Sequence, residues 1–271
     1  MNQQGTLVDA AVDHPTRIDV VILSFAKTAE LRAMTETCLD TLLASEKPGS
    51  IIFDVVVVES NHQSPEYTQL GVRTLYLPPP FNYHRYMNEG IKRGSGNFVA
   101  ICNNDLSFHA GWASQLMEAF SADPDLVSAS PACSLHHPKN GFALHSGVHP
   151  GYRVLKEISG WCLVFRRSML DITGMLDERF YFWYADDDYA RTLEKHNLKH
   201  ALVSSSVVDH LDSKTLEQQS IFNQLMITRK SKFVFQEKWS GKGRLYLFGK
   251  KLKFYMQIPL YYLGLKKIFK K

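Results

Sequence analysis

The chain of 271 residues is 45% hydrophobic and 12% aromatic, with a formal net charge of +4, so it can bury a full core as one α/β domain with an appendage. Its four cysteines are scattered without paired spacing, which argues against a disulfide or zinc framework and for the reduced thiols of a cytosolic protein. Residues 1–16 form a polar N-terminal extension without the apolar core of a signal peptide, so we do not expect export.

Strands and helices alternate along the first hundred residues. Apolar runs predict strands over residues 18–24, 53–59, 72–77 and 97–102, and helical spacing of apolar residues predicts a helix over 29–43. This alternation predicts a parallel sheet with crossover helices. In such a sheet ligands bind beyond the carboxyl ends of the strands.

A first polar cluster lies at one of these strand ends. Asn103, Asn104 and Asp105 directly follow the run 97–102. Asp105 could offer an oxygen to a hard divalent cation that also takes oxygens from a substrate phosphate. In the alternative interpretation Asp105 starts a turn and caps a helix that begins near Ala110.

A second, denser acidic cluster follows an aromatic run. Asp186, Asp187 and Asp188 come after residues 180–184 and before a segment of helical character, so the carboxylates are predicted at a helix N-terminus. The helix dipole alone accounts for acidic residues there. Three consecutive acids exceed what one cap requires, and their mutual repulsion raises the pKa of at least one, as suits a proton acceptor.

Taken in chain order, these and further motifs resemble the family 2 glycosyltransferases of the GT-A fold. The resemblance covers roughly residues 17–213, and an ordered series of short motifs is more specific than any one alone. The motifs are the DXD-like Asn103-Asn-Asp105, the segment Ser159-Gly160 to Arg166-Arg167, the segment Gly174 to Phe180, the acidic cluster, and a strand ending at His210. The resemblance implies a Rossmann-like GT-A domain over 17–227 with a central, mostly parallel sheet flanked by helices.

The resemblance also implies an inverting transfer of sugar from a nucleotide-sugar donor. Asp105 and His210 then hold Mn²⁺ or Mg²⁺, and Asn103 and its neighbour Asn104 approach the metal or the donor ribose. Asp186 is the expected base within the catalytic group that also includes Asp187 and Asp188. The family usually has Glu where this chain has Ala185, so the choice between Asp186 and Asp187 stays open.

The donor pocket is implied in the same way. Ser24, Phe25, Glu59 and Asn61 match the nucleoside site, for which UDP or dTDP is the expected nucleotide. Glu59 stands where the family often has the shorter Asp. In the alternative interpretation, Glu59 is a surface charge at a strand end.

The resemblance places a loop and helix, residues 81–90, near the donor diphosphate. Asn82, Arg85 and Asn88 could donate hydrogen bonds to it. The alternative is an ordinary capped, solvated helix.

On the acceptor side, residues 131–151 hold four histidines, whose spacing matches no usual zinc pattern. We interpret this segment as a mobile loop over the acceptor site. Trp161 and Trp183 flank the proposed chemistry, and their rings could stack on a sugar, although buried aromatic residues occur in any core.

The tail, residues 228–271, is basic and aromatic. It has 13 Lys and Arg against one Glu, which leaves 18 against 26 acidic residues in the rest of the chain. Its apolar runs are too short to span a bilayer, and such segments are typical of the membrane interface. The alternatives are a basic helix docked on the acidic body and a nucleic-acid patch.

Three functions from different classes follow. We expect a metal-dependent glycosyltransferase at the cytoplasmic face of the inner membrane, with a lipid-linked or cell-surface glycan as acceptor, such as lipopolysaccharide or capsule, and without a nucleic-acid partner. The second hypothesis is a nucleotide-sugar-binding module that has lost turnover, as the Ala185 departure suggests. The third is a nucleic-acid-binding protein that uses the basic tail.

Overall fold

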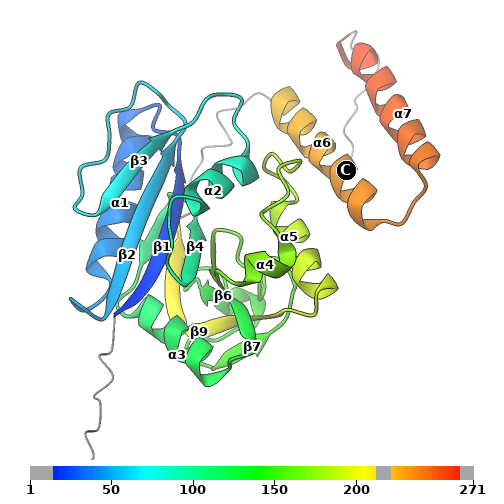
Figure 1. The fold of residues 1–271 in the computed structure, drawn as a ribbon. Coiled ribbons are helices and arrows are strands. Elements are labelled where there is room, and N and C mark those ends of the chain that lie inside the picture. The colour runs from blue at the N-terminus through cyan, green and yellow to red at the C-terminus, as the bar shows by residue number, and fades with distance from the viewer. Residues whose placement is uncertain (1–14, 212–220, 263–271) are drawn as a thin grey trace, which may run out of the picture.

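The protein is described by a computed structural model that covers residues 15–211 and 221–262. Its strands join in one mixed sheet of order β3-β2-β1-β4-β8-β6-β9-β5, with β7 paired to β9 (Figure 1). The strands are β1 (Thr16–Ser24), β2 (Ile51–Glu59), β3 (Val72–Tyr76), β4 (Phe98–Cys102), β5 (Leu106–Phe108), β6 (Leu126–Ala132), β7 (Val148–Pro150), β8 (Cys162–Arg166) and β9 (Lys199–His210).

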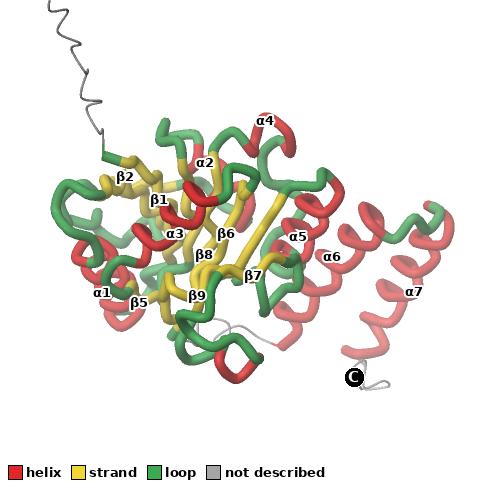
Figure 2. Tube along the Cα trace, turned by 90° about the horizontal axis from the view of Figure 1, so that it is seen from below, coloured by secondary structure: helices red, strands yellow, loops and turns green. Residues whose placement is uncertain are grey.

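The helices flank this sheet, and two of them extend away from it on one side (Figures 1 and 2). The helices are α1 (Ala29–Ala44), α2 (Tyr83–Ile91), α3 (Trp112–Ala122), the 3₁₀ turn η1 (Pro138–Asn140), α4 (Met169–Thr173), α5 (Ala185–Lys195), α6 (Ile221–Trp239) and α7 (Arg244–Tyr262). The predicted α/β class is confirmed, as are the four N-terminal strands and the first helix.

Side-chain alternation along β1 explains the layering. Ile18, Val20 and Ile22 pack in one core cluster with residues of α1 and α3. Val21 and Leu23 point to the other face, where they pack with residues of α2 and α5. Successive strand residues face opposite sides of a sheet, and a strand buried on both faces therefore reads as an unbroken apolar run.

The carboxyl ends of the first strands lie at one edge of the sheet. β1 pairs in parallel with β2 and with β4, so that Ser24 is level with Glu59, and Ile22 with Cys102. The segments that follow these strand ends therefore meet at this edge. It is the edge where open α/β sheets bind ligands.

The two arginines that end the Ser159–Arg167 motif, Arg166 and Arg167, make structural contacts. Arg166 donates to the carbonyls of Leu126 (2.9 Å) and Phe120 (2.7 Å). Arg167 forms an ion pair with the buried Asp19 and donates to the Gly96 carbonyl at 2.7 Å. Both guanidinium groups thus tie β8 to neighbouring segments of the sheet.

The segment 131–151, predicted to be a mobile loop over the acceptor site, contains strand near both ends and no strand in residues 133–147. Its mobility and its place over the acceptor stay predictions. β6 continues to Ala132, and β7 pairs antiparallel with β9. His137 is fully buried, where its Nδ1 accepts from the Cys133 amide at 2.7 Å and its Nε2 bonds the Lys156 carbonyl at 2.9 Å. Backbone pairing and a buried histidine attach this segment to the rest of the domain, and sequence periodicity does not reveal either.

The predicted boundary between the catalytic domain and the tail, at residues 227 and 228, falls inside α6. Residues 1–14 of the predicted N-terminal extension lie outside the described residues. α6 is joined to α7 by the buried side chains of Phe233, Leu247 and Phe254, with the two Phe rings 5.7 Å apart. Each such buried side chain contributes roughly 1.5–3 kcal/mol.

Over the part of the chain that the structure describes, we find no helix with the length and apolar character needed to cross a membrane.

Candidate active site

Asp105 and His210 are brought together by strand pairing. Asp105 directly precedes β5, whose Leu106 is level with His210 at the end of β9. The Leu211 amide donates to the Asp105 carbonyl at 3.0 Å. As a result, His210 Nε2 lies 3.2 Å from Asp105 Oδ2, and the Asp105 side chain is buried.

This arrangement excludes the capping alternative for Asp105. A strand, β5, separates it from α3, which begins only at Trp112. The N-cap of α3 is Gly111, and no side chain caps that helix. Asp105 is therefore available for chemistry at the strand end rather than committed to a helix.

Trp161 connects the two halves of the site. Its indole stacks on the His210 imidazole, with ring centroids 5.1 Å apart and 5° between the planes. Its carbonyl accepts from the Asn103 amide at 2.9 Å. Within the described residues, its buried indole Nε1 has no hydrogen-bond partner. Trp161 thus contacts the proposed metal ligand directly, and its predicted contact with an acceptor stays a prediction.

Asp186 lies against the residue that precedes Trp161. A Cβ built on Gly160 would sit 2.1 Å from Asp186 Oδ2, so only glycine leaves room for this carboxylate. The glycine of the Ser159-Gly160 pair in the sequence motif is therefore explained by the approach of Asp186. Through Gly160 and Trp161, Asp186 is linked to the Asp105 and His210 pair.

Burial makes Asp186 a suitable proton acceptor. Desolvation, and then the nearby charge of Asp187, raise the pKa of Asp186 to about 6. Desolvation also raises the pKa of Asp187, which is partly offset by its own backbone hydrogen bond and by Arg191. The two carboxylates therefore differ, and it is Asp186 that lies against Gly160.

The start of α5 is held in an unusual backbone conformation. Tyr184, its N-cap residue, has φ of 65°, and no side chain caps the helix. A bulky residue in the left-handed region costs on the order of 1–3 kcal/mol and is most often kept at functional sites. The methyl group of Ala185 packs in the core cluster. A small apolar side chain thus occupies the position at which a Glu was expected from the resemblance.

Asp188, predicted to be catalytic together with Asp186 and Asp187, has partners in the tail. Its buried carboxylate accepts from Trp239 Nε1 at 2.7 Å and pairs with Lys238 Nζ at 2.9 Å. Residues two apart on a helix face in different directions, so Asp188 turns away from Asp186. Asp188 anchors the end of α6 on the rest of the domain. A contact of this kind is what the alternative of a basic helix docked on the acidic body predicts.

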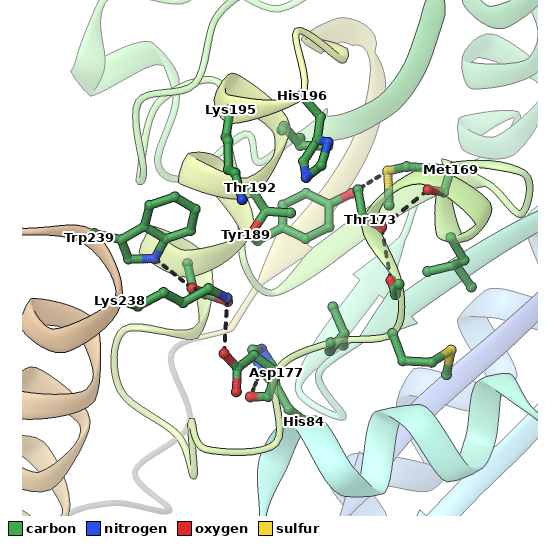
Figure 3. A pocket seen from close by; sticks show the side chains of 16 residues that line it. His84, Met169, Thr173, Asp177, Tyr189, Thr192, Lys195, His196, Lys238 and Trp239 are labelled. Carbon is green, nitrogen blue, oxygen red and sulfur yellow. Dashed lines mark hydrogen bonds and ion pairs between the residues drawn. The ribbon is translucent and has the colours of Figure 1, made fainter.

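The same contact forms part of the wall of a cavity of about 120 Å³ beside α5 (Figure 3). Lys238 also pairs with Asp177 at 3.0 Å. His84 and Tyr189 contribute to the lining. Neither Asp105 nor Asp186 lines this cavity, so it is distinct from the candidate active site.

At the nucleoside end, the predicted residues form one hydrogen-bond network. Glu59 is fully buried, and its Oε1 accepts from the amides of Ala26 (3.1 Å) and Asn61 (2.7 Å). Its Oε2 accepts from the Tyr67 hydroxyl at 3.0 Å. Glu59 is therefore not the strand-end surface charge of the alternative interpretation. Its hydrogen bonds with the Ala26 and Asn61 amides hold the loop after β1. Phe25, in that loop, is 44% exposed.

The network continues to the metal-side loop. The Ser24 hydroxyl lies 2.9 Å from Tyr67 Oη and 3.0 Å from Thr35 Oγ1. Asn104 Nδ2 donates to the same Thr35 oxygen at 2.8 Å. A chain of hydrogen bonds thus runs from Glu59 to the segment that carries Asp105. Such fully paired buried networks rigidify a site.

Asn82, Arg85 and Asn88, which are predicted to bind the donor diphosphate, make hydrogen bonds within the chain. Asn82 caps α2 by accepting from the Arg85 amide at 3.0 Å, and it donates to the Glu178 carbonyl at 2.6 Å. Asn88 donates to the Leu176 carbonyl at 2.9 Å and accepts from the Leu176 amide at 3.1 Å. Arg85 donates to the carbonyls of two prolines before the helix, Pro78 and Pro80. The cap of the alternative interpretation is present, but α2 is largely buried rather than solvated. Binding of these side chains to a diphosphate stays a prediction.

The chemistry of the donor set fits a divalent cation held jointly with a substrate. In residues 15–211 and 221–262, no group of three or more His, Cys, Asp or Glu side chains forms a metal site. Asp105 and His210 supply one oxygen and one nitrogen ligand, which suits Mn²⁺ and is compatible with Mg²⁺. Phosphate oxygens and water complete such shells in nucleotide-binding proteins.

Several residues that support the site could not be predicted from the sequence. Thr35 and Tyr67 join the buried network, and Lys238 and Trp239 hold Asp188. Thr35 lies in an ordinary amphipathic helix, and the basic charge of the tail suggests docking on the acidic body as an alternative without indicating that Asp188 is the partner. Trp183 is 39% exposed and packs edge-on against Phe182, which leaves its predicted acceptor role untested.

Comparison with known proteins bears on the fold. A scan of the sequence against models of protein families finds no match. The chain is 23% identical over 222 residues to the O-antigen biosynthesis protein RfbC of Myxococcus xanthus, which covers 69% of this chain and 17% of RfbC. The chain thus spans less than a fifth of that relative.

Solved structures give a broader likeness. The mannosyltransferase PcManGT of Pyrobaculum calidifontis, in complex with GDP-Man and Mn²⁺, matches at a TM-score of 0.57 with 15% identity, over 86% of this chain and 66% of its own. GalNAc-T7 with UDP, GalNAc and Mn²⁺ matches at 0.56 with 11% identity, over 73% and 44% of the chains. TarS 1–349 of S. aureus matches at 0.51 with 12% identity, over 84% and 74%. The chain therefore has the fold of the GT-A glycosyltransferases.

Proposed function

We propose that the protein is a metal-dependent inverting glycosyltransferase of family 2, which moves a sugar from a nucleotide-sugar donor to a hydroxyl of a glycan. The observation that carries the proposal is the convergence of Asp105, His210 and Asp186 around Trp161 and Gly160. Two solved structures of the same fold hold Mn²⁺ with a nucleotide or nucleotide sugar. The likeness to an O-antigen biosynthesis protein supports a lipid-linked or cell-surface glycan as the acceptor.

In this proposal Asp105 and His210 hold the cation, which when bound neutralises charge on the donor diphosphate. The network from Ser24 to Glu59 fixes the loop on which the nucleoside rests. The exposed ring of Phe25 gives that loop a stacking surface. UDP and dTDP remain the expected donors, and GDP belongs in any test because PcManGT was solved with GDP-Man.

Asp186 takes the proton of the acceptor hydroxyl. The acceptor oxygen forms its bond to the anomeric carbon from the face opposite the leaving group, and the bond from that carbon to the diphosphate oxygen breaks with its electron pair. A single displacement of this kind inverts the anomeric centre. A base whose pKa is about 6 is ionised at neutral pH and still basic enough to share the proton in the transition state.

Slow donor hydrolysis tests the proposal. The purified chain is incubated with UDP-, dTDP- and GDP-sugars in the presence of Mn²⁺, and release of free nucleoside diphosphate is measured. The proposal expects release from at least one donor, and loss of that release in Asp186→Asn with donor binding retained. Binding of a donor without any release by the wild-type chain would contradict it.

A second candidate is a binding module that holds nucleotide sugars without turnover, favoured by the apolar packing at Ala185. It predicts donor binding without release. The nucleic-acid alternative predicts no donor binding and a steep loss of DNA or RNA binding with salt. The same assay therefore separates all three.

A further inference from the structure

Helix α7 has apolar side chains on two faces, and within the described residues one of these faces packs against α6. Leu247 and Phe254 are buried against α6. At 3.6 residues per turn, a second set of apolar side chains falls together on a different side of the helix. We call this set the outer stripe: Leu245, Phe248, Leu252, Tyr255, Met256 and Pro259.

The outer stripe is open to solvent. Leu245 is 88% exposed, Phe248 63% and Met256 66%. The spacing of its members is i, i+3, i+7, i+10, i+11 and i+14, which makes a continuous stripe roughly 100° wide. Contiguous exposed apolar surface of this kind marks an interaction site. In Figures 1 and 2, α7 is the outermost helix and lies on the side of α6 away from the sheet.

The charge around the stripe identifies its partner. Lys251 and Lys253 lie at helix positions on its two sides, with Lys251 in an ion pair with Glu237 at 2.9 Å, and Lys250 follows on the polar face. A hollow of about 230 Å³ between α6 and α7 is lined by Arg229, Lys232, Lys250 and Lys253, with no acidic residue. A partner that complements this region has an apolar layer that contacts the stripe and anionic groups that contact the basic side chains.

From this pattern we propose that the outer stripe of α7 docks on an anionic lipid bilayer, with the helix lying in the interface and its lysines near the headgroups. Interfacial helices bury an apolar face in the acyl boundary while lysines on the remaining surface attract anionic lipids. A second copy of this chain would place lysine against lysine, which is unfavourable. Nucleic acid would leave the stripe in water, because phosphates contact only the cations.

The docking has a structural connection to the candidate active site. Lys238 and Trp239, at the end of α6, bind Asp188 of α5, and Asp186 lies at the start of that helix. A surface-bound α6–α7 pair would thus hold the body with α5 close to the lipid. This inference is independent of the proposed function, because it depends on α7 alone.

The test is flotation of the full-length chain with phosphatidylcholine vesicles, made with and without phosphatidylglycerol. The variant is Phe248→Glu/Leu252→Glu, and the control Leu70→Glu adds a single charge, matched to that of Met256→Glu, at a loop residue that is 95% exposed. Thermal melting checks that each variant folds, and Met256→Glu is a second variant that touches the stripe alone.

We expect the wild type and Leu70→Glu to float with anionic vesicles, and both stripe variants to lose at least about tenfold in partitioning. Lys250→Gln/Lys253→Gln should weaken binding to anionic vesicles only, because these side chains contribute charge. Equal flotation of the stripe variants and the wild type would overturn the proposal. So would a wild type that ignores vesicles but forms a dimer, or binds DNA, through the stripe.

Discussion

The Trp161 indole lies parallel to the His210 imidazole, at 5.1 Å between ring centroids, while His210 Nε2 lies 3.2 Å from Asp105 Oδ2. The aromatic stack fixes the plane of the imidazole and therefore the direction in which Nε2 points. A ligand held in this way needs no further ordering when a cation binds. Trp161 is thus a positioning residue for the proposed metal site.

Replacing Trp161 tests this positioning. Trp161→Leu should weaken Mn²⁺-dependent nucleotide binding by about tenfold, because loss of an orienting contact on a metal ligand typically costs 10- to 100-fold. Trp161→Phe keeps a ring over His210 and should lie close to the wild type. Mn²⁺ titrations at fixed nucleotide concentration measure the effect, and equal Mn²⁺ affinity in all three proteins would contradict it.

The pKa of Asp186 sets a pH dependence. Because desolvation and Asp187 raise its pKa from 3.8 to about 6, we expect turnover to rise with pH through a midpoint near 6 and to level off at higher pH. Asp187→Asn removes the second of these causes and should shift the midpoint to lower pH with activity retained. The measurement is kcat/KM from pH 5 to 8, and a profile flat across pH 6 would contradict the assignment.

The same shift has a consequence for stability. The folded state binds this proton more tightly than the unfolded chain, so stability falls as pH rises from about 4 through 6. Asp186→Asn removes the ionised group and should stabilise the protein at neutral pH by on the order of 1–3 kcal/mol. Urea unfolding at pH 7.5 and at pH 4 measures the difference, which should shrink at the lower pH. A less stable variant at pH 7.5 would argue that Asp186 is a structural ion pair.

Gly160 tests the location of that carboxylate. Gly160→Ala places a methyl group 2.1 Å from Asp186 Oδ2 and should lower kcat by about a hundredfold, because small misplacements of a reacting group are costly. Gly243→Ala is the matched control, since nothing lies within 4 Å of its new methyl group. Donor binding is measured for both. A wild-type kcat in Gly160→Ala would show that Asp186 is not held where the reaction occurs.

The contact of α6 with Asp188 should contribute to stability rather than chemistry. Trp239→Phe removes the 2.7 Å hydrogen bond to this buried carboxylate and should cost about 1–3 kcal/mol. Denaturant unfolding and donor hydrolysis, measured together, separate the two effects. A loss of hydrolysis with unchanged stability would return Asp188 to the catalytic group.

The sequence predicts the parts of this protein that depend on local pattern. Apolar runs locate β1, β2 and β4, and the strand ends locate Asn103 to Asp105 correctly. The pairing of β5 with β9 could not be predicted, because it joins residues about a hundred positions apart. That pairing brings His210 to Asp105, and only the ordered resemblance indicated the His.

Three predicted site residues could not be assigned a role from the sequence, for a common physical reason. Asn82, Asn88 and Asp188 are polar residues near a functional edge, and the sequence alone does not show whether their partners are ligands or other parts of the chain. The structure supplies internal partners for each: backbone groups of residues 176–178 for the two Asn side chains, and Lys238 with Trp239 for Asp188. A polar side chain that is already paired in the fold has little capacity left for a substrate.

The central claim is that Asp105 and His210 hold one divalent cation together with the donor diphosphate. Its most direct test is a Mn²⁺ titration followed by electron paramagnetic resonance, in the presence of UDP, dTDP or GDP, for the wild type, Asp105→Asn and His210→Ala. We predict one nucleotide-dependent Mn²⁺ in the wild type and a loss of affinity of at least about tenfold in each variant. An unchanged Mn²⁺ affinity in both variants would contradict the account.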